Sequence, residues 1–444
     1  MSNAGVKLNI FKGGVHPGEC KGPTDSMAIT RFPTPEKVVI PMRQHIGAPC
    51  QPLVQAGDKV KLGQKIGDTE AFVSAPIHAS VSGEVESVGP YNHPQGGQAE
   101  SVTIISNGND TWHEDVKPIG DIDTLSPDEI LKAIRDAGIV GLGGATFPAH
   151  VKLKPPAEKP IDTVIINGAE CEPYLTGDHR LMLERAEDMI YGLKLMMKVL
   201  NAPHGYIGVE KNKPDAIKNL QELVAGEPNI AVAPLPTKYP QGAEKMLIYS
   251  ITKREVPSGG LPMDVGVVNH NVGSAIAIAE AIREGKPLVE RVATVDGAGI
   301  KEPGNLKFRV GTLISEILQA RGWNKEDTRK LIIGGPMMGM SQTITDLPAI
   351  KGTSGILALT EQEVSIGQSA DCIKCSKCVE ACPIKLIPTF IAQAGERGLV
   401  ERAESYHALD CIECGCCSFG CPAGISLTEK IRDAKKQIMD KRKA

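Results

Sequence analysis

Two short stretches near the C-terminal end carry most of the cysteines of the chain: residues 371–383 read DCIKCSKCVEACP and residues 410–422 read DCIECGCCSFGCP. Each contains the spacing Cys-x2-Cys-x2-Cys-x3-Cys-Pro. The second stretch has five cysteines in eleven residues, and only Cys417 keeps the spacing to Cys421 and Pro422. Cys416 is therefore surplus, and we expect it to be a packed or weakly exposed thiol beside a metal site.

This double spacing is the pattern of bacterial two-cluster ferredoxins, in which the fourth cysteine of each run ligates the other cluster. Zinc is the alternative, but eight cysteines in this spacing with trailing prolines favour iron–sulfur clusters. Residues 384–409, between the runs, are numerous enough for two helices, as in helical ferredoxin domains of larger electron-transfer enzymes. The pattern predicts two [4Fe–4S] ligand sets: Cys372, Cys375, Cys378 and Cys421 for one cluster, and Cys411, Cys414, Cys417 and Cys382 for the other.

The composition of the 444-residue chain limits the kinds of protein to which it can belong. A net charge of -4 and a pI near 6.2 argue against a nucleic-acid partner. The opening MSNAGVKLNIFKGG lacks the basic start and apolar stretch of a signal peptide, and no apolar run approaches the ~18 residues of a membrane span. Nine of the twelve cysteines fall between Cys372 and Cys421, which in a reducing compartment indicates metal ligation. We expect a cytoplasmic protein with no transmembrane segment.

The region before the cysteines predicts several domains of α/β and α+β type. Residues 1–35 are rich in glycine and proline and are expected to form an extended arm. Residues 36–115 contain short β-like runs separated by Gly-Asp and Gly-Gln turns, and they resemble the barrel-sandwich fold of lipoyl and biotinyl carrier domains. The modifiable lysine of those domains is replaced by FVSAPIH at 72–78, so a structural or docking role is favoured over covalent carriage.

The remaining segments divide into three parts. Residues 116–288 alternate strands and helices, with a helix at 125–137 that starts after Ser126 and one long amphipathic helix at 177–200. Residues 289–350 return to short strands around one helix, and 351–355 is expected to be a linker. Residues 351–444 form the cluster domain and end in a basic helix. That helix either docks on anionic lipid or an acidic partner, or simply suits the helix dipole and solvent.

A second candidate site begins in the glycine-rich loop at 138–153, GIVGLGGATFPAHVKL. Gly141, Gly143 and Gly144 have no Cβ, so their backbone N–H groups can approach a phosphate or a flat ring. Alone, the spacing matches neither the dinucleotide fingerprint nor the Walker loop, and an ordinary turn is the alternative. The next stretch, VIINGAECEPYLTGDHRLML at 164–183, is predicted to be a buried strand that ends in polar residues.

Together these stretches resemble the flavin-binding subunit of respiratory complex I, whose loop reads GRGGAGFPTGLK and whose strand end reads NADESEP. The stretch VVNHNVGSA at 267–275 is similar to its NVNNVET. Leu142 replaces the arginine of that loop and Ala169 replaces an aspartate, which leaves the detailed phosphate and ring contacts open. The resemblance implies non-covalent FMN with NADH stacked over it, bound by these residues: Gly141, Gly143, Gly144, Phe147, Lys152, Asn167, Glu170, Glu172, Asn269 and Asn271.

The same resemblance implies roles for four of these side chains. Glu170 would lie by the isoalloxazine, Glu172 by the nicotinamide amide or ribose, Phe147 against the nucleotide and Lys152 at the FMN phosphate. Each has a plainer alternative: an exposed strand end for the glutamates, core packing for Phe147 and a solvated charge for Lys152. Hydride transfer needs no acid–base side chain, so no catalytic residue is predicted.

Nearly the whole chain resembles the C subunits of Rnf complexes, which are membrane-bound, ion-translocating NADH:ferredoxin oxidoreductases. The resemblance rests on the flavin region, the double cysteine pattern and three further stretches: GGVHPGECKGPT at 13–24, EKVVIPMRQHIGAPC at 36–50 and TVDGAGIKEPGNLKFRVGTLISEIL at 294–318. It implies a barrel-sandwich hybrid, a flavin domain like that of complex I, an SLBB-like β-grasp domain at 289–350 and the two-cluster domain. It also implies a peripheral subunit that passes electrons from NADH through FMN and two clusters to other Rnf subunits and, indirectly, ferredoxin.

Two other functions share parts of this pattern. Flavin- and cluster-containing cobalamin reductases of bacterial microcompartments share the glycine loop, the barrel-sandwich segment and the cysteine runs. The GGVHP arm and the PMRQHIGAP stretch favour Rnf. A non-enzymatic electron-transfer adaptor, with clusters but no working flavin site, is the third possibility. Retention of FMN separates the adaptor from the enzymes, and cobalamin reduction without a membrane partner would favour the reductase.

Overall fold

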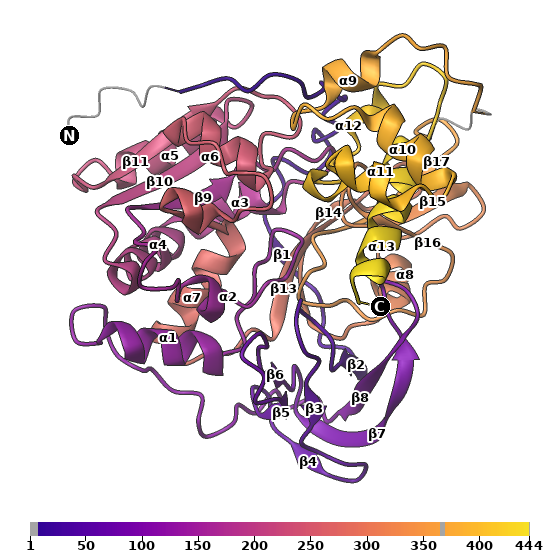
Figure 1. Cartoon of the computed structure of the whole chain (residues 1–444). Helices are drawn as coiled ribbons and strands as arrows, with labels where there is room; N and C mark the ends of the chain where they lie inside the picture. Colours follow the sequence, from indigo (N-terminus) through magenta and orange to yellow (C-terminus); the bar gives the residue numbers. More distant parts are fainter. Residues whose placement is uncertain (1–7, 365–368, 444) are drawn as a thin grey trace.

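The computed structural model describes residues 8–364 and 369–443, so residues 1–7 of the expected arm lie outside the described part of the chain (Figure 1). The first sheet has the order β2-β8-β7-β4, built from β2 (Lys37–Pro41), β4 (Lys59–Val60), β7 (Gly83–Asn92) and β8 (Gln98–Ser106). A smaller sheet has the order β3-β5-β6, built from β3 (Gln51–Pro52), β5 (Lys65–Asp68) and β6 (Ile77–His78). Both sheets contribute side chains to one apolar core, as in a sandwich.

The connection before β6, which contains the FVSAPIH stretch, docks on the next domain. Ala75 is fully buried and belongs to the apolar core of the α/β domain. The buried Lys351 donates from Nζ to the carbonyl oxygens of Pro76 (2.9 Å) and Gly138 (2.7 Å). This arrangement agrees with the expected docking role and attaches the β sandwich to the start of the glycine-rich loop.

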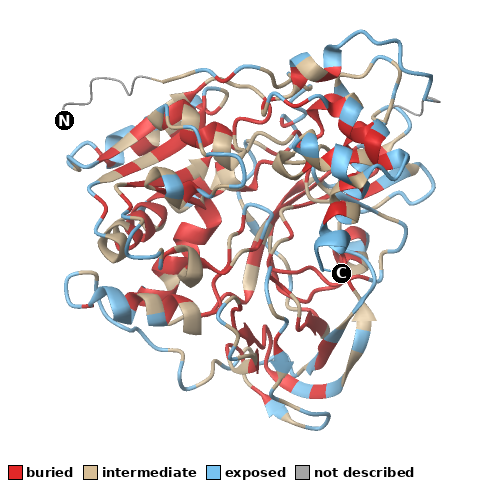
Figure 2. Ribbon diagram, in the orientation of Figure 1, coloured by how far each residue is buried: buried red, intermediate tan, exposed pale blue. Residues whose placement is uncertain are grey.

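A four-stranded parallel sheet forms the centre of the α/β domain, with the order β11-β10-β9-β12. Its strands are β9 (Thr163–Gly168), β10 (His204–Glu210), β11 (Ile230–Leu235) and β12 (Val267–Asn271). Val164 and Ile166 of β9 pack into one apolar core and Ile165 into another, so both faces of the strand are covered (Figure 2). Such a sheet presents the ends of its strands along one edge, where ligands bind in open α/β folds.

Helices cover both faces of this sheet. On one side lie α1 (Pro127–Asp136), α4 (Ala186–Leu200), α5 (Pro214–Leu223) and α7 (Val272–Arg283), and on the other α6 (Glu244–Thr252). The shorter elements are α2 (Ala149–Lys152), α3 (Gly177–Glu184) and a 3₁₀ helix, η1 (Pro262–Val265). The predicted start of α1 is confirmed, because Ser126 Oγ accepts from the Glu129 amide at 3.3 Å and Pro127 follows.

The prediction of one helix over 177–200 is wrong. The helix breaks at Arg185 (φ −134°, ψ 31°) into α3 and α4. The Arg185 guanidinium pairs with Asp188 at 2.8 Å and with Glu280 of α7 at 3.0 Å. The break lets α4 lie along α7 while α3 reaches β13 and β14 of the next domain. Amphipathic periodicity continues across the break and therefore could not reveal it.

The third region is a six-stranded sheet with the order β1-β14-β13-β17-β15-β16. It contains β1 (Thr30–Arg31), β13 (Glu290–Asp296), β14 (Gly304–Arg309), β15 (Thr328–Ile333), β16 (Met340–Gln342) and β17 (Gly355–Thr360), with α8 (Ile314–Ala320). Because β17 lies between β13 and β15, this domain extends beyond the expected boundary at 350. The expected linker at 351–355 is likewise corrected, since Lys351 is buried against two other domains.

The cluster domain consists of α9 (Lys377–Ala381), α10 (Pro388–Glu396), α11 (Val400–Ser405), η2 (Ala408–Asp410), α12 (Cys416–Phe419) and α13 (Leu427–Lys443). The two helices expected between the cysteine runs are α10 and α11. The described part of the arm passes along the α/β domain, reaches the cluster domain and enters the six-stranded sheet as β1 (Figure 1). No helix in the described part of the chain combines the length and apolar content that a membrane span needs.

Gly138 offers a test of the docking between the β sandwich and the α/β domain. It has φ +64°, and a Cβ there would lie 2.1 Å from the Pro76 carbonyl oxygen. We expect Gly138→Ala to lower the free energy of unfolding by about 1–3 kcal/mol more than Gly57→Ala. Gly57 is the matched control, because it has φ +90° and no atom within 4 Å of its Cβ position. Equal melting temperatures for the two variants would contradict the docking contact.

Candidate functional site

The asparagines of the predicted flavin site gather at the carboxyl edge of the parallel sheet. Asn167 is near the end of β9, and Asn269 and Asn271 are on the neighbouring β12. Asn167 Nδ2 donates to the Gly242 carbonyl at 2.8 Å. Asn271 Oδ1 caps α7 by accepting from the Gly273 amide at 2.8 Å. The sequence could predict this edge because polar residues follow two buried strands.

The backbone of the glycine-rich loop is held by a hydrogen bond within the loop and by another to α7. The Gly141 amide donates to the Phe147 carbonyl at 2.9 Å, and the Leu142 amide donates to Ser274 Oγ at 2.8 Å. Gly143 and Gly144 are exposed, and the Cβ position of Gly143 is 3.4 Å from the Cβ of Asn271. A side chain at Gly143 would therefore crowd the asparagine edge. This open backbone fits a flat ring or phosphate lying between the loop and the strand ends.

Lys152 connects the loop region to the strand ends. Its half-buried Nζ lies 2.7 Å from Glu244 Oε1 and 3.0 Å from Asn269 Oδ1. Sequence reasoning missed Gly242, in the connection after β11, and Glu244, the first residue of α6. Only the general rule that ligands bind at this edge could have indicated them. Phe147 is half-buried beside the same loop, and its stacking role stays a prediction.

Glu170 lies in the turn between β9 and α3 and is half-buried. Its carboxylate accepts from the Asp178 amide at 2.6 Å and from the His179 amide at 3.2 Å, at the start of α3. Burial raises the pKa of Glu170, and the Asp178 carboxylate adds to the rise, while Lys21 opposes it. The alternative that Glu170 is simply an exposed residue at the end of a strand is therefore wrong. A contact with the isoalloxazine stays a prediction.

Glu172 contacts the six-stranded sheet domain. Its carboxylate accepts from the backbone amides of Met337 and Met338, both at 2.9 Å, in the connection between β15 and β16. Burial raises the pKa of Glu172 to about 7, and the two amides oppose the rise. The carboxylate thus ties the end of the flavin region to the next domain, and its predicted contact with the nicotinamide is not tested by this geometry.

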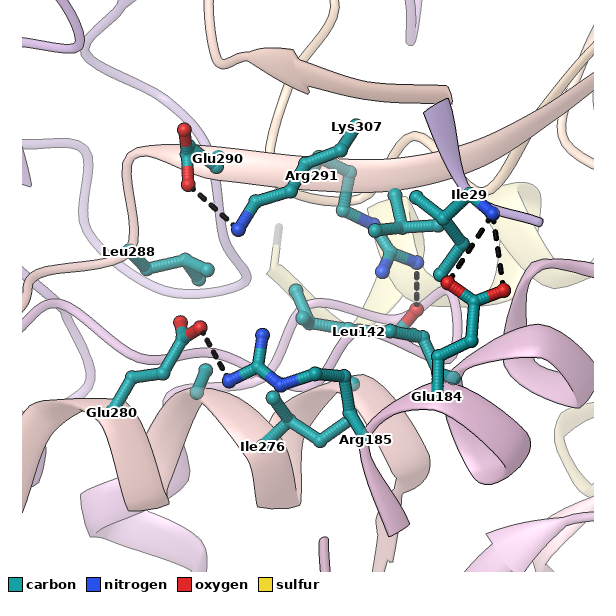
Figure 3. Close-up of a pocket in the computed structure, with 14 residues that line it drawn as sticks. Ile29, Leu142, Glu184, Arg185, Ile276, Glu280, Leu288, Glu290, Arg291 and Lys307 are labelled. Atoms are coloured by element: carbon teal, nitrogen blue, oxygen red, sulfur yellow. Dashed lines mark hydrogen bonds and ion pairs between the residues drawn. The ribbon is translucent and has the colours of Figure 1, made fainter. Parts of the chain in front are cut away.

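The two departures from the flavin-subunit pattern have separate consequences. Leu142 lines a cavity of about 210 Å³ between α3, α7 and β13, behind the glycine loop (Figure 3). Arg291 in the same wall donates from Nη2 to the Leu142 carbonyl at 2.8 Å. Ala169 is fully buried, and its carbonyl accepts from Lys213 Nζ at 2.7 Å. The carbonyl groups of Leu142 and Ala169 thus accept hydrogen bonds that hold the glycine loop and the turn in place.

Five cysteines from both runs line one small cavity in the cluster domain. It measures about 20 Å³, and Cys382 of the first run meets four cysteines of the second: Cys411, Cys414, Cys416 and Cys417. The cavity therefore contains the predicted crossed ligand set together with the surplus Cys416, and which of these thiols bind a cluster stays a prediction. Among the described residues no three His, Cys, Asp or Glu side chains already converge as a metal site. The fit to a cluster rests on the shared cavity and the thiolate chemistry of the lining.

The other predicted ligand set lies nearer the surface. Cys372 and Cys375 are exposed, before α9, while Cys378 is buried. Burial raises the pKa of Cys378, and the nearby Cys421 thiol adds to the rise. Contacts between α9 and α12 bring the ends of the two runs together. The grouping of Cys378 with Cys421 is compatible with the predicted set, which stays a prediction.

Cys416 faces the α/β domain. It is fully buried in an apolar cluster with Tyr239, Ala381 and Cys414, and Cys171 and Met337 pack against this cluster. Gly415 has φ +79°, and its Cβ position is 2.9 Å from the Met337 carbonyl oxygen, so only glycine allows this close approach. The second cysteine run is therefore in direct contact with the turn region of the flavin site.

Four family models match consecutive parts of the chain. They are the RnfC barrel sandwich hybrid domain at 9–109, the Nuo51 FMN-binding domain at 134–280, the SLBB domain at 292–341 and the 4Fe-4S dicluster domain at 365–439. These matches confirm the predicted fold class and the order of its domains. The exact residues at which the predicted domains begin and end stay predictions, apart from the boundary at 350, which β17 corrects.

Two curated relatives cover most of the chain. The C subunit of the Na(+)-translocating ferredoxin:NAD(+) oxidoreductase complex of Acetobacterium woodii is 49% identical over 438 residues, which is 99% of each chain. The C subunit of the proton-translocating complex of Clostridium ljungdahlii is 49% identical over 403 residues, 90% of this chain and 88% of the relative. An NAD+-reducing [NiFe]-hydrogenase structure in the H2-reduced state aligns with a TM-score of 0.48 and 18% identity over 73% of this chain and 65% of the hydrogenase chain.

The surplus cysteine leads to a direct test. We expect Cys416→Ala to keep about eight irons per chain, as two four-iron clusters require, and Cys417→Ala to fall to about half of that. Iron and acid-labile sulfide would be measured on anaerobically reconstituted protein. The reverse order, with Cys416→Ala losing iron and Cys417→Ala keeping it, would show that the register is wrong.

The raised pKa of Glu172 predicts that the stability difference between wild type and a Glu172 variant depends on pH. Its pKa is about 7 in the folded chain against an ordinary value of 4.5, so the folded state binds more protons between these values and stability falls as pH rises through them. Gln keeps an acceptor oxygen for the two amides but cannot ionise. We therefore expect the melting temperature of Glu172→Gln to rise relative to wild type between about pH 5 and about pH 8.

Burial also raises the pKa values of Glu170 and Glu210. Both residues are present in wild type and in the variant, so their effect on stability is the same in the two proteins and does not change the difference. A melting-temperature difference that stays constant with pH would show that folding does not raise the pKa of Glu172.

Proposed function

Because the chain belongs to the family of C subunits of ion-translocating ferredoxin:NAD(+) oxidoreductase complexes, we propose that NADH is oxidised at the carboxyl edge of its parallel sheet. The cofactors are FMN and two [4Fe–4S] clusters, and the protein is an oxidoreductase subunit of a multi-subunit complex. When bound, FMN accepts a hydride from a nicotinamide and passes on single electrons, which the clusters carry. The side chains position these groups.

The observation that carries the proposal is the meeting of the glycine loop, Lys152 and the asparagines at one sheet edge. The open backbone at Gly143 and Gly144 leaves N–H groups for a ring or phosphate. Lys152 supplies a cation that its present partner, Glu244, already holds in place. Asn167, near the end of β9, and Asn269, within β12, add amide groups beside this edge, which suit the polar atoms of FMN.

The two cysteine groups differ in their surroundings. Cys414 of the set with Cys382, Cys411 and Cys417 packs in an apolar cluster with Tyr239 and Met337, whereas Cys372 and Cys375 are exposed. We propose that the inner set receives electrons from the flavin and that the outer set delivers them to another subunit. The protein would then be peripheral, on the cytoplasmic side of the membrane, with NADH as the electron donor and ferredoxin served indirectly.

Substitution of Lys152 tests where the flavin binds. Lys152→Met removes the cation that pairs with Glu244, so we expect FMN to bind about 10- to 100-fold more weakly, the effect of losing a hydrogen bond to a charged group. Fluorescence titration of flavin-free protein would measure the affinity. Lys154→Met is the control, because Lys154 is exposed on the same segment.

Bleaching of the flavin absorbance by NADH tests the reaction itself. Wild-type protein that retains no FMN, or whose flavin NADH does not bleach, would contradict the proposed function. Normal FMN binding by Lys152→Met would contradict only the location of the phosphate.

A further inference from the structure

The N-terminal arm carries one lysine into the interior of the α/β domain. Lys21 is 8% exposed. Its Nζ donates to three carbonyl oxygens of the turn between β9 and α3: Glu170 at 2.9 Å, Glu172 at 2.8 Å and Leu175 at 2.5 Å. An ammonium has three N–H donors, so all of them are used here. Lys21 therefore holds this turn as a bound cation would.

The turn requires such support because its backbone is unusual. Glu170 and Tyr174 have φ values of +47° and +67°, a left-handed conformation that costs energy in residues other than glycine. Buried carbonyl groups also need donors, and none of the described strands pairs with this segment. The ammonium of Lys21 supplies donors to three of them at once.

Other residues of the arm hold the same turn. The Tyr174 amide donates to the Glu19 carbonyl at 2.9 Å, and Thr24 Oγ1 lies 2.7 Å from Thr176 Oγ1. The Thr24 carbonyl in turn accepts from Asn305 Nδ2 of the six-stranded sheet at 3.0 Å. The arm is thus fixed on both sides of Lys21, and the lysine has little freedom to leave.

Lys21 also places positive charge beside the flavin edge. Two of its three carbonyl partners belong to Glu170 and Glu172, the residues whose carboxylates the flavin-subunit resemblance assigns to the cofactors. Lys213, which is 1% exposed, donates to the adjacent Ala169 carbonyl at 2.7 Å. The buried Glu210 carboxylate lies 3.8 Å from the Lys213 ammonium, whereas among the described residues no carboxylate is within ion-pair distance of Lys21. The positive charge of Lys21 is therefore the less compensated of the two, and a low dielectric strengthens its field.

We propose that Lys21 is a positioning residue of the flavin site, which fixes the 170–175 turn and keeps a positive charge that favours the electron-rich form of the cofactor. The inference rests on the proposed function, because it takes the flavin to lie at this sheet edge. A nearby positive charge lowers the free energy of a group that gains electrons. It therefore raises the midpoint potential of the bound flavin.

Three variants of the full chain test this inference. Lys21→Met removes the charge and the donors, Lys21→Gln removes the charge but keeps donors, and Lys12→Met makes the same change at an exposed position of the arm. We expect Lys21→Met to lower the flavin midpoint potential and to retain FMN roughly tenfold more weakly. Lys21→Gln should show the lower potential with a smaller loss of FMN, and Lys12→Met should match wild type.

The potential is the deciding readout, because a purely structural role would change stability and FMN retention but leave the potential of bound flavin unchanged. A wild-type potential in Lys21→Met, or in Lys21→Gln if the first variant does not fold, would overturn the inference. Circular dichroism would establish folding. Wild-type protein that fails to retain FMN would instead contradict the proposed function, so the two failures are distinguishable.

Discussion

The turn between β9 and α3 is the place where most parts of this chain meet. Its carbonyls accept from a lysine of the arm and from Lys213, and its two carboxylates accept from amides of α3 and of the β15–β16 connection. These polar groups are buried or half-buried, and a buried group without a partner costs about 1–3 kcal/mol. The turn therefore depends on the arm and the six-stranded sheet as well as on its own domain. Three parts of the chain that are far apart in sequence therefore support the candidate site together.

The same constraint brings the cluster domain close to the turn. Met337 donates its amide to Glu172, while its carbonyl oxygen meets the backbone at Gly415, where no Cβ intervenes. One residue thus contacts both the candidate flavin site and the second cysteine run. Electron transfer weakens steeply with separation, so a contact through backbone atoms keeps the two redox sites near each other without a mobile linker. The arm adds a second connection, because the Gly14 amide donates to the Ala381 carbonyl at 2.8 Å beside Cys382.

The sequence predicted those features that short-range chemistry determines. The Ser126 cap depends on residues within one turn, and the structure confirms it. The polar ends of β9 and β12 likewise depend on residues of single strands, and these strands lie side by side in the sheet. The cysteine spacing predicts cluster ligands by the same short-range reasoning, and that ligand assignment stays a prediction. Long-range contacts were not predictable in the same way. At the break, Arg185 pairs with Glu280, which is far away in the sequence. β17 pairs with both β13 and β15, which are also distant from it in the chain. Lys21, Gly242 and Glu244 stand in stretches without periodicity, and their roles depend on partners that only the fold brings near.

The basic C-terminal helix has partners within its own domain. On α13, Lys430, Lys441 and Arg442 pair with Glu396, Glu401 and Glu404 of α10 and α11. Exposed pairs of this kind contribute little to stability, typically about 0–1 kcal/mol, but they cancel the charge that a lipid or acidic partner would recognise. Lys435 instead donates to the Cys411 carbonyl at 3.0 Å, and with Arg432 it pairs with Glu413, inside the second cysteine run. Together with the apolar packing of Ile431 and Ala434, these contacts make α13 the support that orders the cluster loop.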